Sequence, residues 1–217
     1  MNPVITKDGS ITFRNEKYDE TYHSISGALE EAFEKYAYPC KLKNGMKVLD
    51  ICFGLGYNSL AAISLANLEI VALENDKEIL KKINNIEIPI NYKIINKKIK
   101  NDLIYNFEKI KKAAKNLNYE DKKSKIKIIL GDARDTIKRL NEKFDAVFLD
   151  PFSPKKCPEL WTEEFFSDIK DIMSQAGILA TYSCTKSVRK NLSNAGFIIK
   201  DGPCIGRKSP STLAYLA

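Results

Sequence analysis

A glycine pair follows the first strongly apolar run of the chain, at residues 47–51, in the segment Phe53-Gly54-Leu55-Gly56. Glycines let a backbone turn tightly and approach a ligand closely, and Asn58-Ser59 can cap the helix expected next. A dinucleotide site would have a third glycine where this chain has Ser59, so the pattern does not favour pyrophosphate binding. We therefore expect Phe53, Gly54, Gly56 and Asn58 to bind a cofactor without phosphate.

Three acids follow three further apolar runs: Glu74 after residues 69–73, Asp132 after 126–130 and Asp150 after 146–149. Carboxylates suit a cofactor with a cationic sulfonium and with hydroxyl and amino donors, and S-adenosylmethionine is such a cofactor. Glu74 lies 18 residues after Gly56, near the spacing at which an acid meets ribose hydroxyls in nucleotide-binding βαβ units.

Asp132 is expected to accept from the adenine amino group, with Ala133 against the ring. Alternatively, Asp132 only caps the helix beginning at Ala133. The two roles are compatible.

Asp150 opens a rigid loop, Asp150-Pro151-Phe152-Ser153-Pro154, because two prolines restrict its backbone. The loop resembles the Asp/Asn-Pro-Pro-aromatic signature of amine-directed methyltransferases. An alkylamine has a pKa near ~10, so it is mostly protonated at neutral pH and lacks the lone pair needed for attack. Asp150 is expected to orient the amine and take its proton. The alternative is a turn-forming role alone.

Alternating apolar strands and helices should position these residues. Seven strands are predicted, at 47–51, 69–74, 126–130, 146–150, 177–182, 197–200 and 212–216. Helices are predicted at 26–36, 59–66, 77–84, 102–116, 133–140, 162–173 and 187–194. Continuously apolar strands are typical of a parallel sheet covered on both faces. We predict an α/β, Rossmann-like fold with a seven-stranded, mostly parallel sheet.

The N-terminus should add a small β-hairpin, since Asp8-Gly9 suits a tight turn between residues 4–6 and 11–13. We expect an extension over residues 1–40, packed on a cofactor-binding domain over 41–217. No apolar run reaches the ~18 residues of a membrane span, and a cytoplasmic location without membrane partners is expected. One histidine and five scattered cysteines argue against a metal site.

Charge is unevenly distributed. Residues 77–127 contain 15 lysines and 6 acidic residues, whereas the whole chain has a net charge of +7. Such a segment can bind the phosphates of RNA, or it can be a solvated helix face. The two interpretations are about equally favoured.

Five short motifs, in the same order over nearly the whole chain, resemble the methyltransferase domain of the MnmC family, which makes 5-methylaminomethyl-2-thiouridine in tRNA. They are Tyr18-Asp19-Glu20-Thr21-Tyr22-His23-Ser24, Phe53-Gly54-Leu55-Gly56-Tyr57-Asn58, Asp150-Pro151-Phe152-Ser153-Pro154, Pro158-Glu159-Leu160-Trp161-Thr162 and Gly206-Arg207-Lys208-Ser209-Pro210.

The resemblance implies a class I methyltransferase that methylates the aminomethyl nitrogen of a wobble uridine in tRNA. It places Tyr22 and Ser24 beside the cofactor and acceptor, with Tyr22 and Asp150 as the catalytic residues and Asp150 also in contact with the cofactor. Trp161, Arg207 and Lys208 would lie on the substrate side, with Pro151 and Phe152 in the acceptor loop. His23 would shuttle a proton or pack beside the cofactor.

The flavin-dependent oxidase half of two-domain relatives is absent from this sequence. No flavin is therefore expected, and a separate enzyme would supply the aminomethyl group. The loop also reads Asp150-Pro151 where relatives often have Asp-Gly, which leaves the nucleoside open. The alternatives are an aminopropyltransferase related to polyamine synthases and a noncatalytic RNA-binding module.

Overall fold

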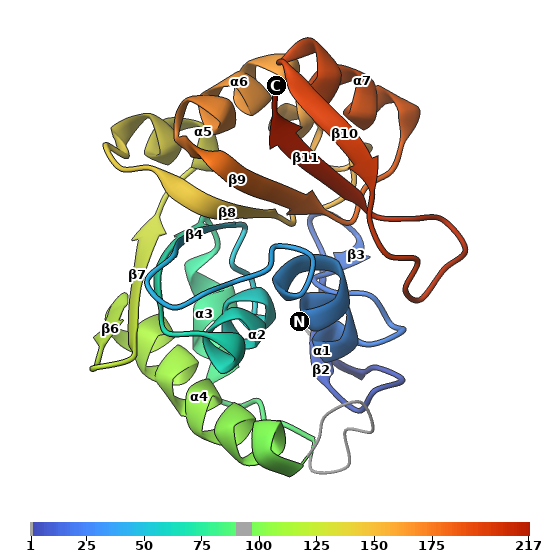
Figure 1. The fold of residues 1–217 in the computed structure, drawn as a ribbon. Helices are drawn as coiled ribbons and strands as arrows, with labels where there is room; N and C mark the ends of the chain where they lie inside the picture. The colour runs from blue at the N-terminus through green and yellow to red at the C-terminus, as the bar shows by residue number, and fades with distance from the viewer. Residues whose placement is uncertain (1, 90–96) are drawn as a thin grey trace.

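The computed structural model describes residues 2–89 and 97–217 and contains a central eight-stranded sheet (Figure 1). The strand order is β10-β11-β9-β8-β4-β5-β7-β6. The five parallel strands are β4 (Lys47–Ile51), β5 (Leu68–Glu74), β7 (Ser124–Leu130), β8 (Phe144–Leu149) and β9 (Met173–Thr181). β4 lies between β5 and β8, where the order of successive strands reverses, and ligands of such sheets collect outside the carboxyl ends at this point.

The edges of the sheet are antiparallel. At one end β10 (Phe197–Asp201) pairs with β11 (Thr212–Leu216), which pairs with β9, and both pairings are antiparallel. At the other end β6 (Asn118–Glu120) pairs with β7. β6 makes eight strands where seven were predicted. The segment Asn118–Glu120 is too short and polar to stand out in sequence, and only its pairing with β7 makes it a strand.

Helices cover both faces of the sheet and bury two apolar clusters (Figure 1). One face carries α1 (Ala28–Glu31), the π-helix η1 (Ala32–Ala37), α2 (Tyr57–Leu65), α3 (Lys77–Ile83) and α4 (Lys97–Asn116). The other carries α5 (Ala133–Thr136), the 3-10 helices η2 (Ile137–Arg139) and η3 (Pro158–Trp161), α6 (Glu163–Asp171) and α7 (Lys186–Asn194). The expected α/β fold is therefore confirmed.

Helix boundaries differ from expectation mainly where the backbone changes its hydrogen-bonding pattern. The helix predicted over 26–36 is a short α-helix that continues as a π-helix, and the helix predicted over 133–140 ends in a 3-10 turn. Residues 90–96 of the lysine-rich segment lie outside the described residues.

The N-terminal segment forms a separate three-stranded sheet of β1 (Pro3–Ile5), β2 (Ile11–Asn15) and β3 (Glu20–Thr21). Its hairpin turns at Gly9 with φ +83°, as the Asp-Gly pair predicted. The Tyr57 hydroxyl of α2 donates to the Ile11 carbonyl, and Phe13 joins the larger apolar cluster. The division of the chain at residue 40 stays a prediction, because both parts contribute to this cluster.

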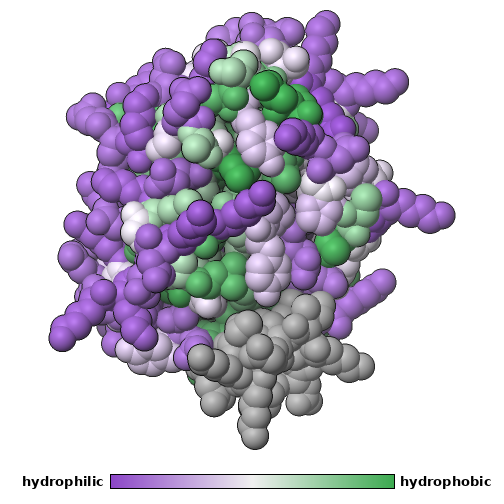
Figure 2. Space-filling view, viewed as in Figure 1, coloured by the Kyte–Doolittle hydropathy of each residue, from purple (hydrophilic) through white to green (hydrophobic). Residues whose placement is uncertain are grey.

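Hydrophilic side chains cover most of the face in Figure 2, and apolar ones gather toward its middle. Among the described residues, no helix combines the length and hydrophobicity that a membrane crossing requires.

Candidate active site and cofactor pocket

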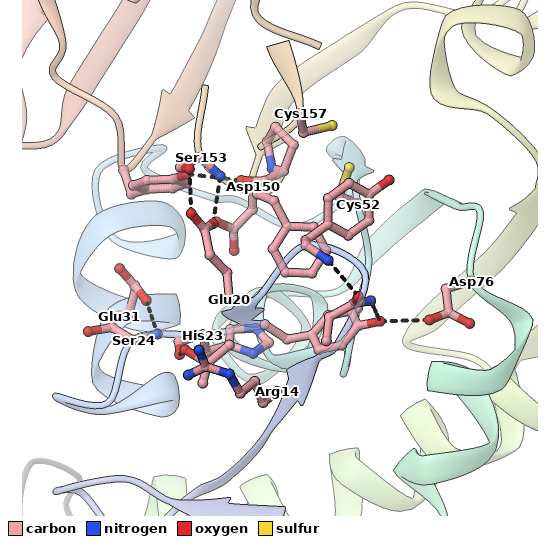
Figure 3. Close-up of a pocket in the computed structure, with 18 of the residues that line it drawn as sticks. Arg14, Glu20, His23, Ser24, Glu31, Cys52, Asp76, Asp150, Ser153 and Cys157 are labelled. Carbon is pink, nitrogen blue, oxygen red and sulfur yellow. Dashed lines mark hydrogen bonds between the residues drawn. The ribbon is translucent and has the colours of Figure 1, made fainter. Parts of the chain in front are cut away.

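A cavity of about 1080 Å³ opens at the carboxyl ends of the central strands, beneath the N-terminal segment (Figure 3). Eight of the site residues expected from sequence line it: Tyr22, Ser24, Gly54, Glu74, Asp150, Pro151, Phe152 and Arg207. The sheet therefore brings together residues that are far apart in the chain. Phe53, Gly56, Asn58, Asp132, Ala133, Trp161 and Lys208 do not line this cavity.

The two glycines of the loop have different roles. Gly54, at φ +56°, faces the cavity, and a Cβ there would meet the Tyr22 ring at 3.5 Å. Gly56, at φ +76°, faces the core: a Cβ would lie 2.6 Å from Ile110 of α4 and 2.7 Å from Phe53. Gly54 thus leaves room for a ligand, whereas Gly56 is needed for close packing of the loop against α4.

Glu74 fixes the shape of the loop from the end of β5. One carboxylate oxygen accepts from the Gly54 amide at 2.7 Å, and the other accepts from the amides of Asn75 and Asp76. Burial raises the pKa of Glu74 to about 7, against the lowering effect of these amides. Glu74 lines the cavity, and its contact with the ribose hydroxyls stays a prediction.

Asp132 and Ala133 line a second, smaller pocket that shares Cys52, Glu74 and Cys157 with the main cavity. The Asp132 carboxylate accepts from the Arg134 amide and forms an ion pair with its guanidinium at 2.7 Å. Asp132 therefore caps α5. The pocket measures about 20 Å³, too small for an adenine ring, so the adenine role stays a prediction that requires this wall to open.

Asp150 accepts hydrogen bonds from two side chains of the helices that cover the sheet, one in η1 and one in α2. The Tyr36 hydroxyl donates to Oδ1 at 2.6 Å, and Asn58 Nδ2 donates to Oδ2 at 2.8 Å. Burial, reinforced by the nearby Glu31 carboxylate, raises the pKa of Asp150 to about 7, while the two hydrogen bonds act in the opposite direction. Asn58 thus supports Asp150 from outside the cavity.

The side chains of Tyr22 and His23 lie against the glycine loop at Gly54. The Tyr22 hydroxyl donates to Asp76 at 2.7 Å and accepts from Asn15, so its bonds lead toward the Glu74 side of the cavity and away from Asp150. His23 is buried with Nδ1 unpartnered, and burial lowers its pKa to about 4. A neutral imidazole in this setting favours packing over proton shuttling.

The acceptor loop is clamped by the N-terminal segment. Phe152 stacks on Tyr18 with ring centroids 4.5 Å apart, and the Ser153 amide donates to Glu20 of β3 at 2.9 Å. Trp161 is buried, and its indole donates to the Phe152 carbonyl. Trp161 therefore shapes the loop from behind, and Phe152 forms the surface a substrate would meet.

Arg207 reaches the cavity from the loop between β10 and β11 and donates to the Tyr182 carbonyl. The Tyr182 hydroxyl in turn donates to the Pro151 carbonyl at 3.0 Å. Lys208 is exposed outside the cavity lining. Arg207 and Lys208 thus occupy different positions although they are neighbours in sequence.

Sequence reasoning assigned no role to four residues that line the cavity, Glu20, Glu31, Lys35 and Asp76. It also missed Tyr36, whose hydroxyl donates to Asp150. Glu31 and Lys35 carried a usable signal, because charges at i and i+4 on an otherwise apolar helix face are unusual. Tyr36 lies in the helix predicted over 26–36, but the sequence carries no sign that its hydroxyl reaches Asp150. No cluster of His, Cys, Asp and Glu suited to a metal ion occurs in the part of the chain that the structure describes.

The donor set fits S-adenosylmethionine. Acidic groups line the wall at Glu74 and Asp150, where hydroxyl donors and a sulfonium would need acceptors and negative charge. The cavity volume is also sufficient for a cofactor of this size.

Comparison with known proteins supports S-adenosylmethionine as the cofactor. The sequence model of a family described as S-adenosyl-L-methionine-dependent methyltransferase matches residues 95–217, and the chain belongs to this family. The crystal structure of MnmC2 from Aquifex aeolicus superposes with a TM-score of 0.80 at 34% identity, covering 99% of this chain and 70% of that one. The expected resemblance to the MnmC methyltransferase domain is thereby confirmed.

Two sequence relatives extend over nearly the whole chain. An uncharacterised protein of Methanocaldococcus jannaschii is 37% identical over 98% of this chain and 58% of its own length. The tRNA 5-methylaminomethyl-2-thiouridine biosynthesis bifunctional protein MnmC of Leptospira borgpetersenii is 24% identical over 94% of this chain and 33% of its own length. The chain thus spans about a third of that bifunctional relative.

Proposed function

We propose that this methyltransferase transfers a methyl group from S-adenosylmethionine to the 5-aminomethyl nitrogen of a wobble uridine in tRNA. One observation supports an amine as the methyl acceptor: Asp150 lines the cavity, both of its carboxylate oxygens accept hydrogen bonds, and its pKa is raised to about 7. The tRNA acceptor is supported by the relatives named for biosynthesis of a methylaminomethyl-uridine. The catalytic role of Asp150 and the cofactor contacts of Ser24, Gly54 and Glu74 are part of this proposal.

Proton transfer is the step that Asp150 would assist. An aminoalkyl group enters mostly protonated, with an ordinary pKa near ~10. Burial lowers the pKa of an amine and raises that of an acid, so the two values approach one another in the cavity. The pKa of Asp150 is shifted in this direction, with burial as the largest cause. The ionised carboxylate can therefore take a proton and leave a neutral amine beside it.

When bound, S-adenosylmethionine would supply a methyl group on a sulfonium: a nitrogen–carbon bond would form as the carbon–sulfur bond breaks, and the sulfur would keep the electron pair as a neutral thioether. Tyr36 and Asn58 hold Asp150 in one orientation, so the amine lone pair can be aligned with the methyl group. Phe152 and Tyr18 offer the adjoining ring surface for the uridine base.

The proposal is tested by incubating the chain with S-adenosylmethionine and tRNA that carries 5-aminomethyluridine, with nucleoside mass spectrometry as readout. We expect a mass increase of one methyl group on that nucleoside. Asp150→Asn should lower the rate by roughly 10²–10⁴-fold, the usual contribution of general acid–base catalysis, with a smaller change in cofactor affinity by calorimetry.

Two results would contradict the proposal. Full activity of Asp150→Asn would remove this residue from the mechanism. Failure to methylate tRNA, together with turnover of decarboxylated S-adenosylmethionine and putrescine, would establish the aminopropyltransferase alternative instead.

A further inference from the structure

A buried ion pair faces the cavity, and its only part in the steps above is that Glu31 helps to raise the pKa of Asp150. Glu31 Oε1 and Lys35 Nζ lie 2.5 Å apart, and the two residues are only 7% and 4% exposed. Both residues line the cavity. The other Glu31 oxygen accepts from the Ser24 amide at 3.1 Å. A ligand in the cavity can therefore contact the Lys35 ammonium and the Glu31 carboxylate at the same time.

The pair lies at the end of the cavity opposite the ribose side. In Figure 3, Glu31 and Asp76 stand on opposite sides of the view, with Asp150 between them. Glu31 ends α1, and Lys35 lies in the π-helix η1, a rare conformation that is frequent at functional sites. The next residue, Tyr36, is the one that holds Asp150. The same short segment therefore positions the ion pair and the acceptor carboxylate.

We infer that Glu31 and Lys35 form the subsite for the methionyl group of S-adenosylmethionine, Glu31 taking its α-ammonium and Lys35 its α-carboxylate. This rests on the cofactor of the proposed function. Breaking a buried ion pair from one side leaves an uncompensated charge and is strongly unfavourable. A zwitterion supplies both counter-charges at once, so it can insert between the two side chains without leaving either unpaired. An acceptor amine alone would satisfy only Glu31.

The subsite also has a consequence for cofactor choice. Decarboxylated S-adenosylmethionine lacks the α-carboxylate, so it would open the pair and leave the buried Lys35 without an anion. The pair therefore selects the methyl donor over the aminopropyl donor.

Binding calorimetry with two probes tests the inference. S-adenosylmethionine carries the zwitterion, whereas 5′-methylthioadenosine has the same adenosine and a thioether without the amino-acid group. In Glu31→Gln and Lys35→Met we expect affinity for S-adenosylmethionine to fall by roughly tenfold or more. Affinity for 5′-methylthioadenosine should stay within about twofold of wild type, because that ligand does not reach the pair.

Two further variants control for folding. The double variant Glu31→Gln/Lys35→Met removes both charges, so neither is left unpaired in the core, and it should show the same ligand-selective loss. Lys109→Met disrupts another buried ion pair, with Asp121 at 3.0 Å, outside the cavity lining, and should bind both ligands as wild type does.

Unchanged affinity for S-adenosylmethionine, or an equal loss for both ligands, would overturn the subsite. The measurement needs no acceptor, so it is independent of the tRNA assay. A chain that shows the selective loss but leaves tRNA unmethylated would support the subsite and contradict the proposed acceptor.

Discussion

Buried acids at the strand ends are the main electrostatic feature of single residues in this protein. Asp50, Glu74 and Asp150 each have a pKa raised to about 7, with burial as the largest cause. Asp50 is fully buried, with Oδ2 bound to the Ser59 hydroxyl at 2.6 Å and Oδ1 unpartnered. Its neighbours Asp150 and Glu74 raise its pKa further. The pKa of Asp50 therefore depends on its burial and on the neighbouring carboxylates of Asp150 and Glu74.

Replacing Asp50 with Asn should change how stability depends on pH. An acid whose pKa is raised by folding stabilises the fold most below its ordinary value of 3.8, and this contribution is lost as pH rises through about 7. Denaturant unfolding from pH 5 to pH 8 should therefore show wild type losing stability relative to Asp50→Asn, by on the order of 2 kcal/mol.

Asp19→Asn is the control for this measurement. Arg14 lowers the pKa of Asp19 from its ordinary value of 3.8, so Asp19 stays ionised from pH 5 to pH 8 and its replacement should not change how stability depends on pH in this range. A stability difference between wild type and Asp50→Asn that stays constant from pH 5 to pH 8 would show that Asp50 is not titrating in this range.

At the scale of elements, the glycine loop depends on helix α4 as much as on the cofactor. A Cβ on Gly56 would clash with the side chains of Ile110 and Phe53, whereas a Cβ on Gly54 would make an ordinary contact with the Tyr22 ring at 3.5 Å. The loop is therefore pressed against the core at one glycine and exposed to the cavity at the other.

Gly56→Ala should destabilise the protein by roughly 2–4 kcal/mol, since the positive φ and the crowded Cβ both oppose a side chain. Gly45→Ala is the matched control: its φ is +86°, but nothing lies within 4 Å of the added Cβ. The control should lose only about 1–2 kcal/mol. Equal losses in denaturant unfolding would mean that packing against α4 adds nothing.

At the scale of the whole molecule, the N-terminal segment completes a cavity that the sheet alone leaves open. Glu20 and Ser153 meet across a separation of 133 residues, and Tyr18 stacks on Phe152. Lys17, over the Tyr18 ring, and Arg207 both line the cavity and are exposed to solvent. Two cations thus flank the entrance at which a nucleotide phosphate would arrive.

The variant Lys17→Gln/Arg207→Gln should weaken tRNA binding and reduce the slope of log affinity against log salt by roughly 1 per lost contact. Lys190→Gln/Lys200→Gln, exposed and outside the cavity lining, should leave both quantities unchanged. Filter binding across a salt series measures both. An unchanged slope in the first variant would exclude phosphate contacts at this entrance.

The same assay on Lys112→Gln/Lys115→Gln distinguishes the two interpretations of the lysine-rich segment. These side chains are exposed on α4, whereas Lys109 and Lys111 are engaged with Asp121 and Glu108. A smaller salt slope would indicate RNA contact, and an unchanged slope a solvated helix face.

The sequence by itself determined the parallel strands of the sheet and the residues at their carboxyl ends, but not the edge strand β6. Apolar runs identify buried parallel strands because both faces of such a sheet are covered, and residues at their carboxyl ends then meet at one edge. Glu74 and Asp150 could be placed at the cavity in this way, and the motif order indicated the family.

Only the tertiary structure decided which groups engage them. Tyr36 reaches Asp150 from a π-helix 114 residues away, and Glu20 clamps the acceptor loop from the N-terminal sheet. Glu31 and Lys35 look like an ordinary helical charge pair until packing removes them from solvent and turns them toward the cavity. Periodicity predicts which face of a helix is buried, but hydrogen bonds and ion pairs across the fold depend on distances that only the packed chain defines.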